Sequence, residues 1–295
     1  MRTLAIAAVQ TKPIAGDIDA TWARYADQIH AIRETFPQVQ LVVHPELHLS
    51  APGLLLQEDP SYADQVAIEL PGPLTDKLAE LARQTGLWLV PGSVYERGVH
   101  GAVHNTAVVV APDGRLAAQY RKCFPWQPYE TTTPGTDLVV FDMELSDGQN
   151  TRIGLAICYD GAFPEVFRQL AWSGAEVVLQ PTLTPTRDRE MELVFARANA
   201  GVNQIYVVGV NGSDPHATGE SVIVDPEGNV RQQARGGEEI LMDVLDLDAV
   251  TRVRTFGSFG LNRPWEQLDK HGPNLQLPMY GHINPRPTAA PPSTV

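Results

Sequence analysis

Short apolar runs alternate with segments of helical periodicity along most of the chain. Residues 4–9 have the length and composition of a buried strand. The segment that follows places apolar side chains on one face of a helix, at Trp22, Tyr25, Ile29 and Ile32. Further strand-length runs lie at 41–43, 87–90, 153–157, 177–179 and 205–210. The alternation predicts repeated β-α-β units.

Proline and glycine mark the ends of the later helices. Residues 75–83 form a helix pattern that ends at Gly86, and residues 164–173 form one that begins with Pro164 and ends at Gly174. A further helix is predicted over about 188–200, because apolar residues recur there at i, i+3, i+4 and i+7, the spacing of one helix face. These residues are Met191, Val194, Phe195 and Ala198.

Two pairs of short strands flank turn sequences. Residues 106–111 and 115–120 surround Pro-Asp-Gly at 112–114, and residues 221–224 and 230–233 surround Asp-Pro-Glu-Gly at 225–228, so both pairs are predicted hairpins. Alternating helices and strands with interposed hairpins favour an α/β fold in which two mixed sheets pack face to face under helices, a four-layer α-β-β-α sandwich. A doubly wound single sheet is the alternative.

The composition changes near the end of the chain. We predict one domain over residues 1–271, a length that large single α/β domains reach. Residues 272–295 end in PRPTAAPPSTV, and prolines with small polar residues cannot build a core. We interpret this segment as a linker-like arm or a disordered tail, with ordering against a partner subunit as a third option.

Composition and charge exclude several classes of partner. Hydrophobic residues make up 43% of the chain and charged residues 19%, and the apolar runs are too short to span a membrane, so we expect a soluble protein. The net charge of -13 argues against nucleic acid and against anionic membrane surfaces. The apolar stretch in MRTLAIAAVQ is too short for a signal sequence, and we therefore expect a cytoplasmic location.

Cys158 lies where a reactive thiol would be expected. A predicted strand at 153–157 delivers it to a turn just before the helix that begins near Pro164, and the positive end of a helix dipole favours a thiolate. The alternative is a buried structural cysteine. Cys123 is the other cysteine, and in a cytosolic chain two such cysteines are more often free thiols than a disulfide.

Two charged residues also lie at predicted strand ends. Glu46 ends the run LVVHPEL and could act as a general base, although an exposed or capping carboxylate is the alternative. Lys122 closes the strand AAQYRK, where a solvated lysine is the commoner outcome. The two-residue period of a strand puts Tyr120 and Lys122 on one face and Arg121 and Cys123 on the other, which makes Cys123 the less suitable nucleophile.

The sequence does not predict a metal or a cofactor. In HPELH, the side chains of His44, Glu46 and His48 would share a face of an extended chain, but Pro45 interrupts it and the helical HExxH spacing is absent. GxGxxG, P-loop and GxSxG motifs are absent as well, so nucleotide binding and serine-hydrolase chemistry have no support.

Three of these segments together resemble the carbon-nitrogen hydrolase (nitrilase) superfamily. HPEL, YRKCFPW and LAICYDG carry a Glu, a Lys and a Cys in the order of that family. The resemblance implies a catalytic triad of Glu46, Lys122 and Cys158 and extends over most of the chain. Three motifs in order are far more specific than any one of them.

A narrower resemblance concerns the segment RKCFPWQPYETTTPG, which is similar to RKxxPWxPxE of formamidases and short-chain aliphatic amidases. It implies that Glu130 is a second glutamate that helps to hold the lysine and the substrate, and that Trp126 is a wall of the pocket. The alternatives are a turn carboxylate and a core aromatic. The chain departs from those amidases in its shorter length, in His44, and in RANAGVN, which lacks the acidic residue of the commoner RAxEN.

The resemblance implies a cysteine-dependent amidase that converts a small amide into a carboxylate and ammonia through a thioester, without a cofactor. Lys122 and the backbone N–H of Tyr159, a substrate-binding residue, would stabilise the oxyanion. A nitrilase or an N-carbamoyl amide hydrolase with the same triad is the alternative enzyme, and acyl transfer in place of hydrolysis remains open. A non-catalytic binding module is the hypothesis from a different functional class. The family also implies a homodimer or a higher homo-oligomer.

Overall fold

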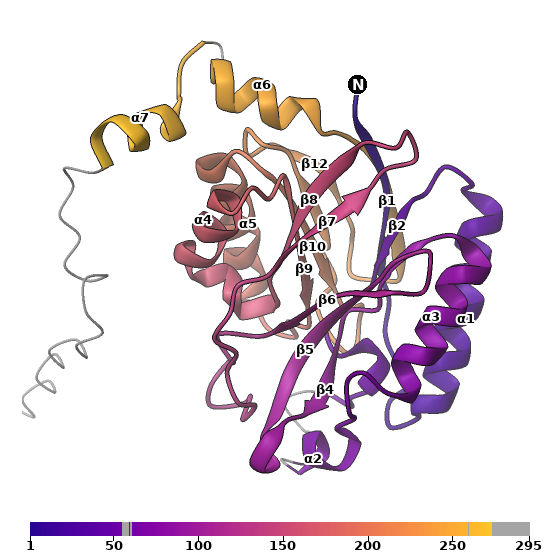
Figure 1. The fold of residues 1–295 in the computed structure, drawn as a ribbon. Helices are drawn as coiled ribbons and strands as arrows, with labels where there is room; N and C mark the ends of the chain where they lie inside the picture. The colour runs from indigo at the N-terminus through magenta and orange to yellow at the C-terminus, as the bar shows by residue number, and fades with distance from the viewer. Residues whose placement is uncertain (55–58, 60, 259, 273–295) are drawn as a thin grey trace, which may run out of the picture.

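Two β-sheets packed face to face form the centre of the molecule, as the computed structural model shows for residues 1–54, 59, 61–258 and 260–272 (Figure 1). One sheet has seven strands in the order β13-β1-β2-β3-β5-β4, with β6 paired to β5, and the other has six in the order β12-β11-β10-β9-β8-β7. Both sheets are mixed. The four-layer α-β-β-α sandwich is confirmed, and the doubly wound single sheet is wrong.

The strands are those that the apolar runs predict, with three additions, β4, β7 and β13. In chain order they are β1 (Thr3–Gln10), β2 (Leu41–Val43), β3 (Trp88–Val90), β4 (Ser93–Arg97), β5 (Val103–Val110), β6 (Leu116–Arg121), β7 (Val140–Glu144), β8 (Asn150–Leu155), β9 (Val177–Thr182), β10 (Tyr206–Asn211), β11 (Val222–Val224), β12 (Val230–Gln233) and β13 (Glu239–Asp246). Both predicted hairpins are confirmed, since β5 pairs antiparallel with β6 and β11 with β12.

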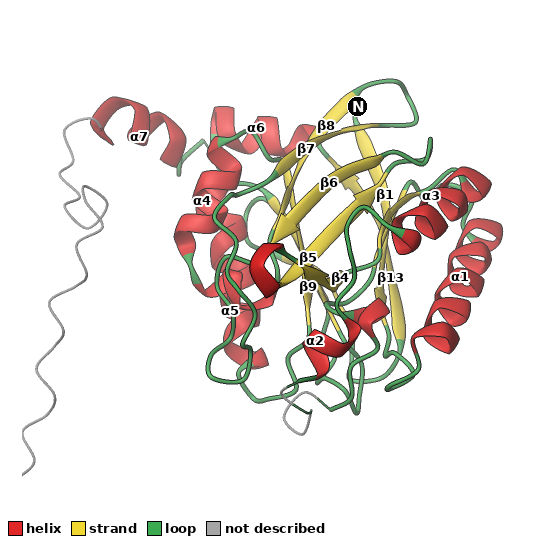
Figure 2. Cartoon of the chain, turned by 60° about the horizontal axis from the view of Figure 1, so that its bottom comes forward, coloured by secondary structure: helices red, strands yellow, loops and turns green. Residues whose placement is uncertain are grey.

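Helices cover the outer faces of the two sheets. They are α1 (Ile18–Thr35), α2 (Tyr62–Val66), α3 (Pro73–Thr85), α4 (Pro164–Trp172), α5 (Arg189–Asn203), α6 (Asp248–Phe256) and α7 (Pro264–His271), with short 3₁₀ turns η1 (His48–Ser50), η3 (Val99–Gly101) and η4 (Cys158–Ala162). Helices α1 and α3 lie on the side of the seven-stranded sheet, and α4 and α5 on the side of the six-stranded sheet (Figures 1 and 2). None of these helices is both long and apolar enough to cross a membrane.

Alternation along the strands divides the apolar core into layers. In β1, Leu4, Ile6 and Ala8 point into the space between the sheets, whereas Ala7 and Val9 point toward α1 and α3. The other sheet follows the same rule, because alternate residues of β9 and β10 face either the first sheet or α4 and α5. The central strands of each sheet are therefore buried on both faces, which explains why they read as nearly continuous apolar runs.

The apolar face predicted for α5 is not the buried one. Met191 is 54% exposed and Val194 56% exposed, and Ala198 also lies on the surface. The buried side of α5 instead carries Arg189, Ala196, Asn199, Ala200 and Asn203. Two of the polar members have partners on neighbouring segments, because the Asn199 amide donates to the carbonyl of Gly161 at 2.9 Å and Arg189 donates to that of Glu220 at 2.8 Å. The helix thus turns a polar side chain toward a buried backbone carbonyl of η4.

Two histidines of HPELH are buried beside α1. The rings of His44 and His48 lie 5.2 Å apart and pack against Tyr25, at 4.6 and 6.3 Å between centroids. Burial lowers the pKa of His48 to about 3 and that of His44 well below its usual value. Both side chains are therefore neutral parts of the core.

We expect these histidines to make the fold sensitive to mild acid. A histidine in the unfolded chain takes up a proton at about pH 6.5. In the folded chain, His48 stays neutral until about pH 3. The free energy of unfolding therefore decreases as the pH falls through that interval. His48→Gln should flatten the dependence of the free energy of unfolding by up to about 1.4 kcal/mol per pH unit, measured by urea unfolding between about pH 6 and about pH 5.

Two features make that measurement specific. Burial raises the pKa of Asp160 to about 6, and its contribution has the opposite sign, but it is the same in parent and variant and cancels in the difference. His30→Gln, at an exposed position of α1, should leave the slope unchanged. A parent and a His48→Gln variant with equal slopes would contradict the buried neutral histidine.

Candidate active site

Side chains from both sheets meet where parallel strands end. Glu46 follows β2 of one sheet, Cys158 follows β8 of the other, and the N–H of Glu46 donates to the carbonyl of Thr182 at the end of β9, at 3.3 Å. The β-α-β connections of each sheet bring the carboxyl ends of their strands to one edge, and open α/β sheets bind ligands there. Lys122 joins them from the end of β6.

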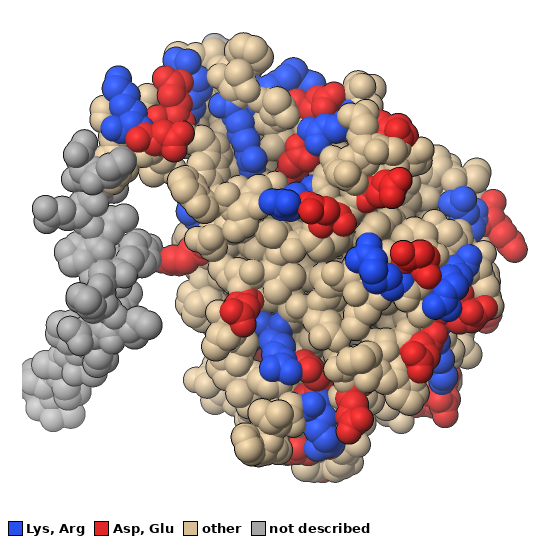
Figure 3. Space-filling model, viewed as in Figure 1, with Lys and Arg blue, Asp and Glu red and all other residues tan. Residues whose placement is uncertain are grey.

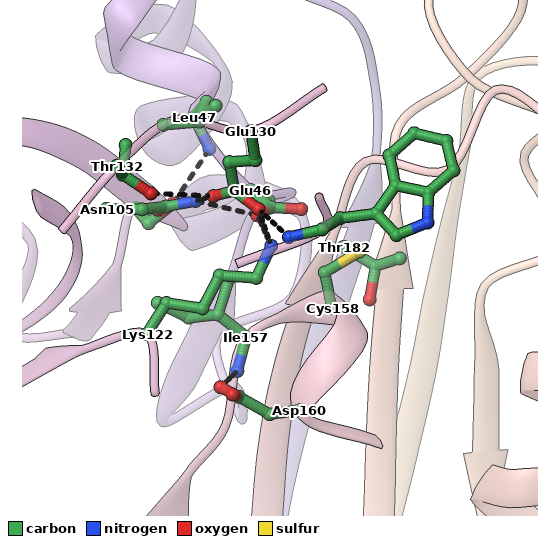
Figure 4. A network of polar contacts seen from close by, with 12 residues as sticks. Glu46, Leu47, Asn105, Lys122, Glu130, Thr132, Ile157, Cys158, Asp160 and Thr182 are labelled. Carbon is green, nitrogen blue, oxygen red and sulfur yellow. Dashed lines mark hydrogen bonds and ion pairs between the residues drawn. The ribbon is translucent and has the colours of Figure 1, made fainter. Parts of the chain in front are cut away.

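The ammonium of Lys122 is buried between two carboxylates. Its Nζ lies 2.9 Å from Oε1 of Glu46 and 2.6 Å from Oε2 of Glu130, and the lysine side chain is 2% exposed (Figure 4). Burial by itself would lower the pKa of Lys122, but the charges of Glu130 and Glu46 outweigh it and raise the pKa well above the usual value. The lysine is therefore a fixed cation at neutral pH.

Asn105 connects the same two carboxylates, and the sequence did not reveal it. Its Nδ2 donates to Oε1 of Glu46 and to Oε1 of Glu130, both at 2.8 Å. The residue lies in β5, where all eight positions are buried. A polar amide within that buried run was the available signal, because buried polar groups need hydrogen-bond partners.

The two glutamates differ in electrostatic environment. Burial raises the pKa of Glu46 and exceeds the opposing effect of Lys122, which suits a carboxylate that accepts a proton during a reaction. Burial acts in the same direction on Glu130, but Lys122 and Asn105 outweigh it and lower the pKa. The backbone N–H of Trp126 also donates to Glu130, at 2.8 Å. Glu130 thus has the surroundings of a permanent anion that holds Lys122.

Cys158 is presented by a strained turn. Its φ of 45° lies in the left-handed region, and its carbonyl accepts a hydrogen bond from Nε2 of Gln180 at 2.8 Å. Such strain persists where the surrounding structure holds it, and it is frequent at functional sites. Burial and Glu46 raise the pKa of Cys158 well above its usual value, against the opposing effect of Lys122. These surroundings oppose the thiolate that the helix dipole was expected to favour.

Asp160 fixes this turn to the segment that follows Lys122. Its carboxylate accepts from the N–H of Ile157 at 2.9 Å, the hydroxyl of Tyr120 at 2.7 Å and the N–H of Phe124 at 2.9 Å. The aspartate is fully buried and joins the two sheets. It belongs to the CYD motif, but the sequence alone gave it no role.

A cavity of about 230 Å³ joins the candidate residues. Its lining includes Glu46, Lys122, Trp126, Glu130 and Cys158. A second cavity of about 180 Å³ borders the same sulfur and is lined by Trp126, Tyr159, Met191, Glu192 and Phe195 among others. Trp126 therefore lies on the wall of both cavities, and Tyr159 on that of the second.

The strand alternation predicted around Lys122 is confirmed. Tyr120 and Lys122 are buried, whereas the side chain of Arg121 is 44% exposed and pairs with Glu96 at 2.6 Å. Cys123 is half-buried, and its sulfur lies 3.8 and 4.0 Å from the backbone carbonyls of Arg121 and Asp137. It does not line either cavity. Both cysteines are free thiols.

The interpretation of HPELH as a metal site gains no support. The rings of His44 and His48 pack against Tyr25, whereas the carboxylate of Glu46 binds Lys122. Among the residues that the structure describes, no three His, Cys, Asp or Glu side chains form a group that could hold a metal ion.

Known proteins share both the sequence pattern and the fold. The pattern that defines the carbon-nitrogen hydrolases matches residues 5–255. The chain belongs to this family. A formamidase of Bacillus cereus is 32% identical over 196 residues, which cover 66% of this chain and 57% of the relative. This carbon-nitrogen hydrolase thus spans less than two thirds of the length of the curated relatives it matches.

Solved structures agree with that assignment. Nit3 of Saccharomyces cerevisiae, a member of branch 10 of the nitrilase superfamily, superposes with a TM-score of 0.72 at 27% identity and covers 86% of this chain and 94% of its own. A carbon-nitrogen hydrolase from Helicobacter pylori G27 has a TM-score of 0.77 at 23% identity, over 95% and 99% of the two chains. The second similarity is one of fold.

The buried ion cluster predicts a distinctive response to loss of its cation. Lys122→Met should lower the free energy of unfolding by about 3–5 kcal/mol, because it leaves two buried carboxylates without their cation. Their folded pKa values then rise above the unfolded ones, so the loss of stability relative to the parent is smallest in acid and grows as the pH increases. Urea unfolding at about pH 5 and about pH 8 measures the difference.

A second substitution tests whether charge is the cause. Adding Glu130→Gln to Lys122→Met removes one of the two uncompensated carboxylates and should recover part of the loss at the higher pH. An equal loss at both pH values, with no recovery in the double variant, would mean that Lys122 acts through packing alone.

Proposed function

We propose that this carbon-nitrogen hydrolase is a cysteine-dependent amidase that converts a small linear amide into a carboxylate and ammonia. The observation that carries the proposal is the convergence of Glu46, Lys122 and Cys158 on one cavity, with Glu130 behind the lysine. A nucleophile, a base and a fixed cation are the groups that acyl transfer from an amide requires. The formamidase relatives support the same reaction class.

In the first half-reaction, the neutral thiol loses its proton only as it reacts. Glu46 accepts the proton of Cys158 while the sulfur forms a bond to the carbonyl carbon, and the carbonyl oxygen becomes an oxyanion. Lys122 and the backbone N–H of Tyr159 stabilise that oxyanion. Glu46 then returns the proton to the leaving nitrogen, the C–N bond breaks, and ammonia departs from a thioester.

In the second half-reaction, water replaces ammonia. Glu46 takes a proton from water as its oxygen attacks the thioester carbonyl, and the oxyanion forms at the same position beside Lys122. The C–S bond breaks, the proton returns to the sulfur, and the acid is released. Glu130 keeps Lys122 in place in both halves and orients the incoming nucleophile, since it accepts hydrogen bonds from Lys122, Asn105 and the N–H of Trp126.

A nitrilase or an N-carbamoyl amide hydrolase would use the same residues. In a nitrilase the sulfur adds to the C≡N carbon and forms a thioimidate. Separately, attack on the thioester by an amine or hydroxylamine in place of water would make the reaction an acyl transfer. An apolar wall such as Trp126 discriminates weakly between small acyl groups. A panel of amides, nitriles and carbamoyl compounds, assayed for ammonia release, ranks these substrates.

Cys158→Ala should abolish ammonia release from the accepted amide, because the sulfur is the attacking atom. Intact-protein and peptide mass spectrometry after a rapid quench should find the acyl group on the Cys158 peptide of the parent. Cys123→Ser is the matched control and should keep the parent rate. Equal ammonia release by Cys158→Ala and the parent, or an acyl group on Cys123, would refute the assignment.

We also propose that the protein works in the cytoplasm on a small molecule and not on nucleic acid. Two free thiols suit a reducing compartment. Acidic and basic side chains are interspersed on the face seen in Figure 3, and the net charge is -13. Neither property suits a phosphate backbone.

We further propose a homodimer or higher homo-oligomer that forms through the exposed apolar face of α4 and α5. Trp172 is 64% exposed, Val194 56% and Val202 48%, an apolar surface of the kind that marks a protein interface. Val194→Glu should shift the protein toward monomer in sedimentation velocity. Val99→Glu, at an exposed valine of η3, is the control and should leave assembly unchanged. Identical sedimentation of all three proteins would rule out this face.

A further inference from the structure

The sulfur of Cys158 also faces a polar array outside the Glu46–Lys122–Glu130 cluster. Its Sγ lies 3.7 Å from Oγ1 of Thr184, which is two residues beyond the end of β9. The same hydroxyl lies 2.8 and 2.9 Å from the two carboxylate oxygens of Glu192, in the first turn of α5. Nη1 of Arg189 donates to that carboxylate at 3.0 Å. The reaction described above uses none of these three side chains.

The array has one direction of hydrogen bonding. A carboxylate can only accept, and Glu192 accepts from both Thr184 and the guanidinium of Arg189, so the single hydroxyl proton of Thr184 points to Glu192. Toward the sulfur, Thr184 then presents oxygen lone pairs. Only a thiol, which has a proton to donate, makes a favourable contact there, whereas a thiolate would face lone pairs and a second anion.

Surrounding contacts hold the array in place. The N–H of Thr184 donates to Oδ1 of Asn211 at 2.9 Å, and Nδ2 of Asn211 donates back to the carbonyl of Thr184 at 3.3 Å. The side chain of Arg189 is 4% exposed and also donates to the carbonyl of Glu220, at 2.8 Å. Buried groups with several partners keep their orientation, so these contacts keep Oγ1 of Thr184 between the sulfur and Glu192.

We propose that Thr184 and Glu192 are positioning residues that hold the resting Cys158 as a neutral thiol directed at Thr184, until bound substrate allows Glu46 to take the proton. The sulfur would then swing its S–H from Thr184 to the Glu46 carboxylate as the bond to the carbonyl carbon forms. The catalytic meaning of this inference rests on the proposed function, but the hydrogen-bond array itself does not.

The charges around the sulfur agree with this assignment. Lys122 favours loss of the proton, and the N–H of Leu183 does so weakly, whereas Glu46 and Glu192 oppose it. Asp188 borders the same cavity as Glu192. Two carboxylates therefore face one sulfur from different elements, Glu46 from the loop after β2 and Glu192 from α5, and the ammonium of Lys122 is shared with Glu46 and Glu130.

Glu192→Gln tests the direction of the array. A glutamine amide can donate to Oγ1 of Thr184, which frees the hydroxyl proton to point at the sulfur and stabilise a thiolate. In a Cys123→Ser background, the pH profile of Cys158 modification by methyl methanethiosulfonate should move to lower pH by about one unit, about tenfold faster on the acid side. Glu190→Gln, an exposed carboxylate on the same turn, should keep the parent profile.

Thr184 variants separate hydrogen bonding from simple charge. Thr184→Ser keeps the hydroxyl and should retain the parent profile, and circular dichroism checks that each variant is folded. In Thr184→Val, the shift caused by Glu192→Gln should shrink to a minor part, because the group that transmits it is gone. An undiminished shift in that background, or no shift in Glu192→Gln itself, would overturn the proposal.

These outcomes are independent of the amidase assignment. If Cys158→Ala loses ammonia release but the pH profile of Cys158 modification in Glu192→Gln equals that of the parent, the positioning role is wrong and the amidase assignment stands. If Cys158→Ala keeps ammonia release while Glu192→Gln shifts as expected, the thiol is held by the array but is not the nucleophile.

Discussion

The ion cluster formed by Lys122, Glu46 and Glu130 is the interaction on which the site depends. A charge in the interior costs several kcal/mol unless opposite charges and hydrogen bonds compensate it, and here one cation serves two anions. Asn105 supplies donors to both carboxylates, which offsets part of the negative charge that one lysine leaves uncompensated. A carboxylate held in this way needs little reorganisation when it accepts a proton, which is why burial of the cluster favours chemistry more than stability.

After burial, the same cluster contributes to the raised pKa of the Cys158 thiol. Burial and the charge of Glu46 raise the pKa of Cys158, and Lys122 opposes them. Because the ammonium of Lys122 is also paired with Glu46 and Glu130, it offsets only part of that rise. A reaction in which the proton leaves as the C–S bond forms avoids a free thiolate in this environment. In the proposed amidase reaction, the oxyanions of both half-reactions form at one point, so one fixed lysine serves both.

Much of the fold and the main residues of the site could be predicted from local patterns. Apolar runs that are buried on both faces indicate parallel strands. The ends of such strands place Glu46 and Cys158 at the sheet edge where open α/β folds bind ligands. A period of two was enough to separate Lys122 from Arg121 and Cys123. Asn105 could not be predicted as a site residue, because its role depends on hydrogen bonds to carboxylates 59 and 25 residues away in the sequence. β13 escaped for the same reason, since its partner, β1, lies at the other end of the chain.

The failure of the apolar period in α5 has a physical cause that links fold to site. At the edge where parallel strands end, backbone carbonyls such as those of Gly161 and Glu220 have no strand partner and need donors. The side of α5 over this edge therefore carries Asn199 and Arg189, whose amide and guanidinium supply those donors, and the large apolar residues Met191 and Val194 face outward. The helix that covers an active-site edge is thus a place where the rule that apolar faces are buried should be expected to fail.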